Sequence, residues 1–304
     1  MSTGAQIAAR AVDGAGLARR DHRGRGASAA FNGLMYGAVT ISVLALGVLL
    51  YDVVKDGAGA VDAQFFQNQP SKVRPETAGA QSAILGTVYL MLITAAIVIP
   101  LGVATALYLE EYADRTRWWN RLIELNIQNL AAVPSVVYGI LGLAFFVRAP
   151  LSLGSVLLAG GMTLALLVLP VVIIVAREAI RAVPSSIREG SLALGATQWQ
   201  TIAKQVLPAS VPGVATGVIL ALSRAIGETA PLLLIGAAAS PRFNPDGLDS
   251  AFTALPVQIL TWSTDADQES FLPLAAAAIL VLMGVLLLMN SVAIWLRHRY
   301  EQQW

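Results

Sequence analysis

Long apolar blocks dominate this chain and restrict it to folds in which most helices cross a bilayer. A helix needs about 20 apolar residues to span the hydrocarbon core. Only 13% of the residues are charged, against about 25% in a typical soluble domain. We therefore predict an all-α integral membrane protein with six transmembrane helices. The six blocks are 33–51, 83–109, 127–147, 151–175, 212–239 and 272–296.

The Lys and Arg residues are spread unevenly over the predicted loops, and this asymmetry predicts the orientation of the chain. With the N-terminus inside, the inner segments hold fourteen of these residues and the outer segments hold five. Loops rich in Lys and Arg stay on the cytoplasmic side. Both termini are therefore expected in the cytoplasm.

The segments between the blocks give the expected domain boundaries. Residues 1–30 are rich in Gly, Ala and Arg, so we expect a disordered cytoplasmic tail. The first transmembrane helix is expected at 31–54 and a polar outer linker at 55–79. A signal peptide is the alternative for the first block, but the block is too long and no convincing cleavage site follows. The core membrane domain is expected at 80–300, with a cytoplasmic loop at 177–208.

The sequence contains no ATP-binding motif and no metal-binding cluster of its own. It has no Cys and two His, which excludes disulfides and thiolate metal sites, and we expect no cofactor. A net charge of +1 gives no reason to expect nucleic acid. A P-loop needs a Lys followed by Ser or Thr, but Lys55, Lys72 and Lys204 are followed by Asp, Val and Gln. We predict no catalytic residues and no ATP hydrolysis by this chain.

The loop 177–208 carries the signals of a short helix outside the membrane. Ser186 and Glu189 have the spacing of a capping box, in which each side chain bonds the other residue's backbone N–H. Gly195 is a natural C-terminal stop. The pattern predicts a helix at 186–195, and from these residues alone a simple connector lying on the membrane surface is equally compatible.

Two opposite charges lie inside the fifth block. Arg224 and Glu228 are four residues apart, which places them on one face of a helix, near mid-bilayer. A charge there costs at least about 2.5–3.5 kcal/mol, so such residues face the bundle interior and pair. One interpretation is an ion pair that fixes helix packing. The other is a transport path in which Arg224 attracts an oxyanion and Glu228 balances or gates it.

Polar side chains also gather in the inner half of the third block. They are Asn126, Asn129, Ser135 and Tyr138. Path lining and interhelical hydrogen bonding explain them equally well.

The loop 177–208 resembles the EAA loop of bacterial ABC import permeases. The resemblance rests on Glu-Gly-Ser at 189–191, Gly195, and Gln-Val-Leu-Pro at 205–208. Gly-Ser replaces the two alanines of the family pattern, and Gln205 stands where Ile or Val is preferred. In the family this loop forms a coupling helix that sits in a cleft of the ATPase subunit. The resemblance implies ATPase docking through Ser186, Glu189, Gly190, Ser191, Ala193, Gly195 and Ala196.

Three further stretches are similar to the PstA-type permeases of phosphate ABC importers. They lie at 224–233, 129–139 and 254–259, and the similarity extends over about 80–300. It implies the type I ABC importer permease fold and import of inorganic phosphate by alternating access in a bacterial cytoplasmic membrane. The implied path residues are Arg224 and Glu228, to which we add Thr229, Ser135 and Asn129 as candidates.

The same resemblance implies partners. These are a PstC-type permease in a heterodimer, two copies of an ATPase subunit and an external phosphate-binding protein. The other contacts expected are phosphate and membrane lipid. The nearest alternative is the same machine with sulfate or molybdate as cargo. A gradient-driven carrier or anion channel is the alternative of another class, and it leaves the short inner helix unexplained.

Overall fold

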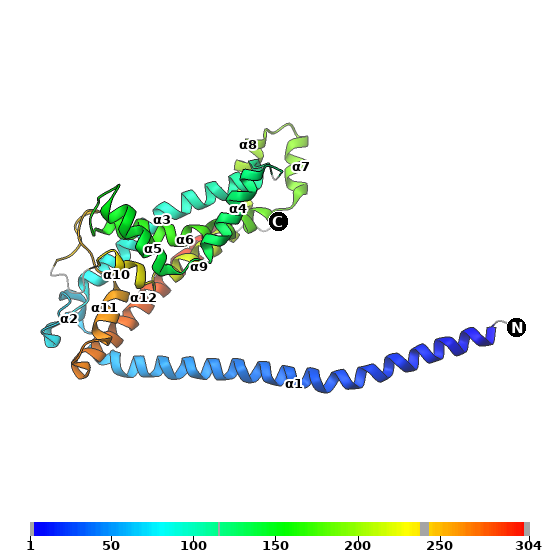
Figure 1. Ribbon diagram of the computed structural model, residues 1–304, viewed down its shortest axis with the longest axis horizontal. Coiled ribbons are helices and arrows are strands. Elements are labelled where there is room, and N and C mark those ends of the chain that lie inside the picture. Colours follow the sequence, from blue (N-terminus) through cyan, green and yellow to red (C-terminus); the bar gives the residue numbers. More distant parts are fainter. Residues whose placement is uncertain (1–2, 115, 238–242, 301–304) are drawn as a thin grey trace. The chain divides into compact units, whose positions relative to one another are not determined.

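The computed structural model describes residues 3–114, 116–237 and 243–300, with side chains from residue 28 on, except those of 29, 296 and 300. All regular structure in these ranges is helical (Figure 1), as predicted. The chain divides into two compact units, Met1–Val53 and Val54–Trp304, which we describe separately.

The first unit holds nearly all of helix α1 (Thr3–Gly57). The segment Ala30–Ala60 is long and apolar enough to cross a membrane. The helical backbone also covers residues 3–30, where the sequence predicted a disordered tail. Since the side chains of residues 3–27 lie outside the described part, as do residues 1 and 2 altogether, the state of this tail stays a prediction.

Four long helices make the core of the second unit, and they run side by side in Figure 1. A large apolar cluster includes the buried Leu90, Val98, Leu164 and Val172, and the last of the four helices packs against it through partly buried residues such as Leu286. Close packing depends on small residues, because a Cβ added to Gly102 would lie 2.7 Å from Val172 Cγ1. The four helices are α3 (Gln81–Leu107), α6 (Leu157–Arg181), α9 (Leu207–Ala225) and α12 (Gln268–Tyr300).

The segment that precedes α3, predicted to lie outside, is folded against the core. It contains η1 (Ala58–Ala60), α2 (Ala63–Gln67) and η2 (Pro75–Thr77). Asp62 caps α2 by accepting a hydrogen bond from the Phe65 backbone N–H at 2.8 Å. The buried Phe65 ring packs against Trp262 of α11 (Leu255–Ser263), and their ring centroids are 6.2 Å apart. These contacts fix the outer end of the bundle.

By length and composition, five helices of the described chain can cross a membrane, and a bent pair brings the number to six if the pair forms one span. The pair joins α4 (Trp118–Ala131) to α5 (Ser135–Gly142) and the π-helix η4 (Leu143–Arg148) at an angle of 106°. The continuous helix predicted at 127–147 is therefore wrong. Pro134 causes the break, because it lacks an N–H and disfavours helical geometry in the residue before it.

The fifth block also differs from its predicted range of 212–239. Helix α9 begins earlier, following α8 (Gln198–Thr201) and the π-helix η5 (Ile202–Val206) without interruption. It ends at Ala225, and the chain turns before the short helix α10 (Ala230–Leu234). Pro231 lies in the first turn of α10, where its missing N–H costs no helix hydrogen bond. Residues 238 and 239 of the block lie outside the described residues.

The fourth block is shifted toward the C-terminus, from the predicted 151–175 to α6 at 157–181. The segment before α6 is irregular, and Gly154 adopts a positive φ of 81° there. Hydropathy does not register such a turn, because Leu151, Leu153 and Val156 keep the local mean apolar. The second block ends in a further π-helix, η3 (Tyr108–Tyr112), which continues α3.

Candidate functional site

The predicted inner-loop helix is present as α7 (Ser185–Ala193). Its N-cap is Pro184, and no side chain caps it, so the predicted capping box of Ser186 and Glu189 is wrong. Helix geometry starts one residue earlier than expected, which places Ser186 inside the first turn. A capping box is found instead in α8, where the Gln200 backbone N–H bonds Thr197 Oγ1 at 3.3 Å and Thr197 N–H bonds Gln200 Oε1 at 2.9 Å.

The C-terminus of α7 is closed by Gly195, as predicted. Gly195 has a φ of 86°, a conformation that L side chains rarely adopt. Its N–H bonds the Leu192 carbonyl at 2.9 Å, and the Ala196 N–H bonds the Ser191 carbonyl at 3.2 Å. These two bonds make a Schellman motif, which satisfies the last carbonyls of the helix. Open space surrounds the place where a Cβ would lie, so glycine is favoured here by the backbone conformation and not by a lack of room.

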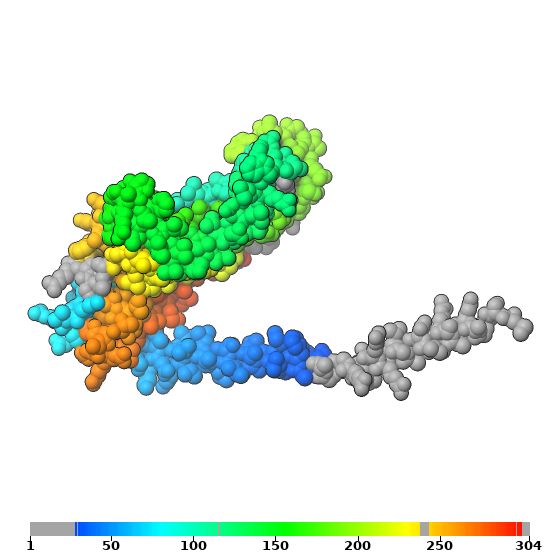
Figure 2. All heavy atoms as spheres, viewed as in Figure 1, coloured from blue at the N-terminus to red at the C-terminus, as the bar shows by residue number. Residues whose placement is uncertain are grey.

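The residues predicted to dock an ATPase lie on an exposed surface at one end of the bundle (Figure 2). No residue of α7 is buried. Apolar side chains stand out beside them: Leu194 is 90% exposed and Trp199 is 64% exposed. Large exposed apolar side chains at the loop are consistent with an interaction surface. Exposed are Ser186, Glu189, Gly190, Ala193 and Gly195, while Ser191 and Ala196 are half-buried.

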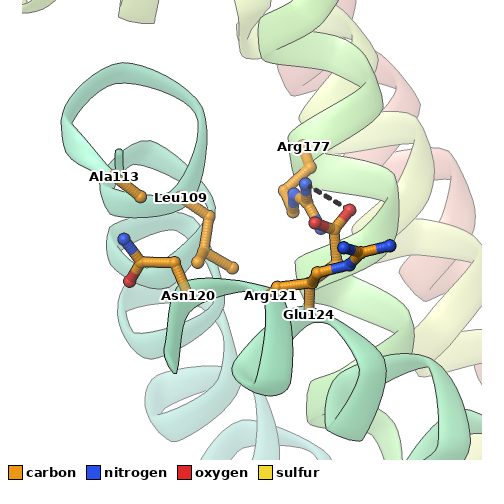
Figure 3. A pocket seen from close by; sticks show the side chains of 6 residues that line it. All are labelled: Leu109, Ala113, Asn120, Arg121, Glu124 and Arg177. Carbon is orange, nitrogen blue, oxygen red and sulfur yellow. Dashed lines mark hydrogen bonds and ion pairs between the residues drawn. The ribbon is translucent and has the colours of Figure 1, made fainter. Parts of the chain in front are cut away.

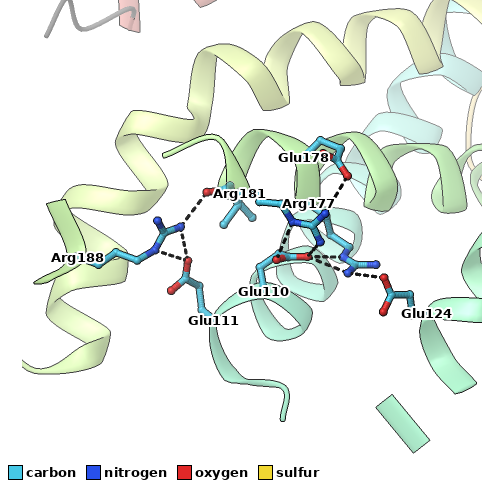
Figure 4. Close-up of polar contacts among 8 residues, drawn as sticks. Glu110, Glu111, Glu124, Arg177, Glu178, Arg181 and Arg188 are labelled. Carbon is cyan, nitrogen blue, oxygen red and sulfur yellow. Dashed lines mark hydrogen bonds and ion pairs between the residues drawn. The ribbon is translucent and has the colours of Figure 1, made fainter. Parts of the chain in front are cut away.

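A cluster of charges that the sequence did not predict joins the inner ends of α3, α4 and α6 (Figure 4). Arg177 Nη2 lies 2.8 Å from Glu110 Oε1 and 2.9 Å from Glu124 Oε1. Arg181 reaches the same Glu110 oxygen at 2.8 Å. The Glu110 side chain is only 4% exposed, so its charge depends on these two guanidinium groups. The sequence shows two Glu after the second block and two Arg after the fourth block, but it does not show that they meet.

A cavity of about 180 Å³ opens beside this cluster (Figure 3). Asn120 closes one side of it and donates from Nδ2 to the Asp114 carbonyl at 3.0 Å. Asp114 in turn organises the turn between η3 and α4. Hydrogen bonds from the Thr116 hydroxyl, at 2.7 Å, and from the Thr116 backbone N–H hold the pKa of the Asp114 carboxyl below its ordinary value. These hydrogen bonds stabilise the charged form of the Asp114 carboxylate.

Arg224 and Glu228 meet at the break between α9 and α10. Arg224 lies in the last turn of α9, and Glu228 lies in the turn that follows. Arg224 Nε is 3.6 Å from Glu228 Oε1, so the predicted pairing is present although the two do not share one continuous helix. The Arg224 side chain is 60% exposed and that of Glu228 is 18% exposed.

A small cavity of about 10 Å³ brings Arg224 and Ser135 together. Asn129, Glu228 and Thr229 do not line it, and Asn129 is exposed on α4. Tyr138 also lines the cavity, but its hydroxyl donates to the Leu130 carbonyl at 2.7 Å. That bond satisfies a carbonyl freed by the break at Pro134. The role of these residues in a path stays a prediction.

Asn290 of α12 makes a polar contact with α9 that sequence reasoning missed. Its Oδ1 accepts from Ser223 Oγ at 2.8 Å, one residue before Arg224. A single Asn in an apolar block is the only sequence signal for it. Over the described residues, no group of three or more His, Asp or Glu is placed to hold a metal ion.

Residues 98–302 match the family model described as a binding-protein-dependent transport system inner membrane component. A probable ABC transporter permease protein, YqgI of Bacillus subtilis, is 33% identical over 212 residues, covering 69% of this chain and 71% of that protein. The phosphate transport system permease protein PstA 1 of Mycobacterium tuberculosis is 32% identical over 253 residues, covering 82% of each chain.

A solved structure supports the same architecture. A chain of the MetNI methionine ABC transporter, in inward-facing conformations, superimposes with a TM-score of 0.57 at 17% identity. The match covers 74% of this chain and 95% of that one. At this identity the likeness concerns the fold alone, which is the ABC importer permease fold expected from the sequence.

Proposed function

Because the chain belongs to the binding-protein-dependent transport system inner membrane component family, we propose that it is the permease subunit of an ATP-driven phosphate importer. The phosphate transport permeases of the relatives, aligned over most of both chains, support this cargo. The host membrane is the cytoplasmic membrane of a bacterium, with both termini inside. An external phosphate-binding protein delivers the anion at the opposite face.

The exposed α7 is the feature that supports docking of an ATPase. A nine-residue helix with a Schellman stop is a rigid body, and the exposed apolar Leu194 directly after it offers a contact for a partner. The sequence carries no P-loop, so the energy comes from separate ATPase subunits. In a complex with two permease chains, each coupling helix takes one ATPase copy.

The exposure of Arg224 is the single observation that carries the proposed path. The side chain is 60% exposed on a helix that crosses the membrane, and a charge facing lipid at that depth is costly. A second membrane chain therefore covers this face, and the anion passes between the two. A PstC-type permease in a heterodimer is the partner that this proposal assigns.

Arg224 has the chemistry to receive phosphate. Its guanidinium offers five N–H donors, and its distance of 3.6 Å to Glu228 exceeds that of a strong charge-assisted hydrogen bond. The side chain therefore keeps donors for an oxyanion. Glu228 balances the charge while the path is empty and is displaced by phosphate. Alternating access then follows from movement of α9 against its neighbours as the ATPase subunits close.

Uptake of labelled phosphate in a strain that lacks this chain tests the proposal. Complementation by the wild-type chain is expected to restore uptake, and excess unlabelled phosphate, but not sulfate or molybdate, is expected to compete. Competition by sulfate or molybdate instead would assign another oxyanion. Uptake that persists without the ATPase subunit would indicate a channel or gradient-driven carrier and would contradict the proposal.

A further inference from the structure

The end of α3 that continues into η3 contacts the loop that contains α7 at two places, one in α7 and one in α8. The π-helix η3 adds a residue to this end, and such segments are frequent at functional sites. Glu110 and Glu111 follow each other in η3 but reach different partners. Glu110 bonds Arg177 and Arg181 of α6, whereas Glu111 faces the loop.

Glu111 makes two kinds of contact with the loop. Its carboxylate Oε1 accepts from Arg188 Nε at 3.0 Å and from Arg188 Nη2 at 2.8 Å. Its backbone carbonyl accepts from Gln198 Nε2 at 2.7 Å. Arg188 lies within α7 and Gln198 begins α8, so one residue of η3 is bonded on both sides of the Schellman stop.

Arg188 extends this connection to α6. Its Nη1 donates to the Val183 carbonyl at 2.6 Å, and its Nη2 donates to the Ile180 carbonyl at 2.8 Å. These carbonyls belong to the C-terminal end of α6 and the residues just after it. One guanidinium therefore joins α3, α6 and α7 (Figure 4). The side chains of Arg188 and Glu111 are 23% and 10% exposed, so water screens the pair only weakly.

We propose that Glu111 and Arg188 form a clamp that makes α7, the end of α3 and the end of α6 move as one body. This inference rests on the proposed docking of an ATPase at α7. The chain enters α7 through Pro184 and leaves it through Gly195, where irregular backbone permits rocking. The planar fork of arginine opposes such rocking, because several donors fix its orientation. Both are positioning residues for energy coupling.

The test compares Glu111→Gln and Arg188→Lys in the complete complex, reconstituted in vesicles with the binding protein. Three quantities are measured: the ATPase that co-purifies, ATP hydrolysed, and phosphate transported per ATP. We expect unchanged co-purification, sustained hydrolysis, and a fall of about fivefold or more in phosphate per ATP, the lower end of typical coupling between sites. Glu178→Gln is the matched control, since that carboxylate is 65% exposed and its ion pair with Arg181 is long, at 3.5 Å.

A parallel loss of assembly, hydrolysis and uptake at an unchanged ratio would overturn the clamp and leave a structural role. An unchanged ratio with unchanged activities would overturn it as well. A wild-type complex that neither binds an ATPase nor transports phosphate would instead refute the proposed function on which the clamp rests.

Covalent bridging of the two positions tests whether Glu111 and Arg188 act by holding the helices together or only by stabilising the fold. The chain has no Cys, so Glu111→Cys with Arg188→Cys introduces its only thiols. After thiols of the other subunits are blocked, a short bis-maleimide joins the two positions. We expect a low phosphate-per-ATP ratio before bridging and a restored ratio after it, with no rescue in either single variant. A ratio that stays low in the bridged protein would contradict the proposal.

Discussion

Arg224 Nε lies 3.6 Å from Glu228 Oε1 across the point where α9 ends and the chain turns toward α10. The two charges therefore bracket a break in a membrane helix. Backbone groups released at a membrane break are tolerated only where protein or a polar cavity surrounds them. A pair of opposite charges at this break, with Arg224 more exposed than Glu228, fits a place that an anion passes.

Replacing Arg224 tests the path directly. Arg224→Gln removes the positive charge, and we expect phosphate uptake to fall at least tenfold while the complex still assembles. Arg224→Lys keeps the charge but loses the fork, so uptake is expected to be intermediate. The initial rate of labelled-phosphate uptake is the measurement.

Ser223→Ala is the matched control for Arg224. It removes the hydrogen bond of 2.8 Å to Asn290 without touching the charge, at a cost of about 1 kcal/mol in stability. Uptake per assembled complex is expected to stay at the wild-type level. If Arg224→Gln transports as well as Ser223→Ala does, the assigned role of Arg224 is wrong.

Gly195 tests whether the stop of α7 matters for docking. Gly195→Val forces a β-branched side chain into a φ of 86°, at a cost of about 1–3 kcal/mol. We expect at least a fivefold loss of co-purifying ATPase. Gly195→Asn is expected to stay within about twofold of wild type, because Asn tolerates left-handed geometry. Equal binding by the Val and Asn variants would exclude a role for this backbone conformation.

Glu189 tests the charge of the docking surface. The side chain is exposed, so Glu189→Lys is expected to change the chain's own stability by no more than about 0.5 kcal/mol. Co-purification of the ATPase is expected to fall about tenfold, since reversed charge at an interface is repulsive. Glu178→Lys, an equally exposed reversal outside α7, is the control. Unchanged ATPase binding in both Glu189→Lys and Gly195→Val would remove the docking assignment.

The buried charge cluster predicts that Glu110 contributes more to the stability of the fold than Glu124 does. Glu110→Gln leaves Arg177 and Arg181 short of a partner in a site where the carboxylate was 4% exposed, and we expect about 3 kcal/mol less stability. Glu124 is 40% exposed, so Glu124→Gln is expected to cost about 1 kcal/mol or less. Unfolding of the purified chain in detergent, followed by circular dichroism, compares them. A larger loss at Glu124 would contradict the account.

Much of this architecture could be predicted from the sequence because apolar blocks report burial in lipid. The blocks located every long helix, and the spacing of the inner loop located α7. Hydropathy averaged over a block did not reveal the breaks at Pro134 and after Ala225, since one proline or a few polar residues leave the block's mean apolar. Local residue spacing also misplaced the capping box, because both Ser185 and Ser186 follow Pro184.

The charge cluster lay beyond sequence reasoning for a different reason. Arg177 and Glu110 are 67 residues apart, and Arg188 and Glu111 are 77 apart. The packing of α3 and η3 against α6 brings Glu110 to Arg177, and the fold of the loop that contains α7 brings Arg188 to Glu111. The pairing of Arg224 with Glu228 could be anticipated because the two are only four residues apart, although α9 ends between them.

Reconstitution tests the central claim most directly. The chain would be purified with its partner permease and ATPase subunits, placed in vesicles that contain ATP, and supplied outside with labelled phosphate and the binding protein. The account predicts phosphate accumulation against its gradient that requires ATP and is lost in Arg224→Gln. Phosphate entry that ignores ATP, or no entry from a complex that hydrolyses ATP in response to the loaded binding protein, would contradict it.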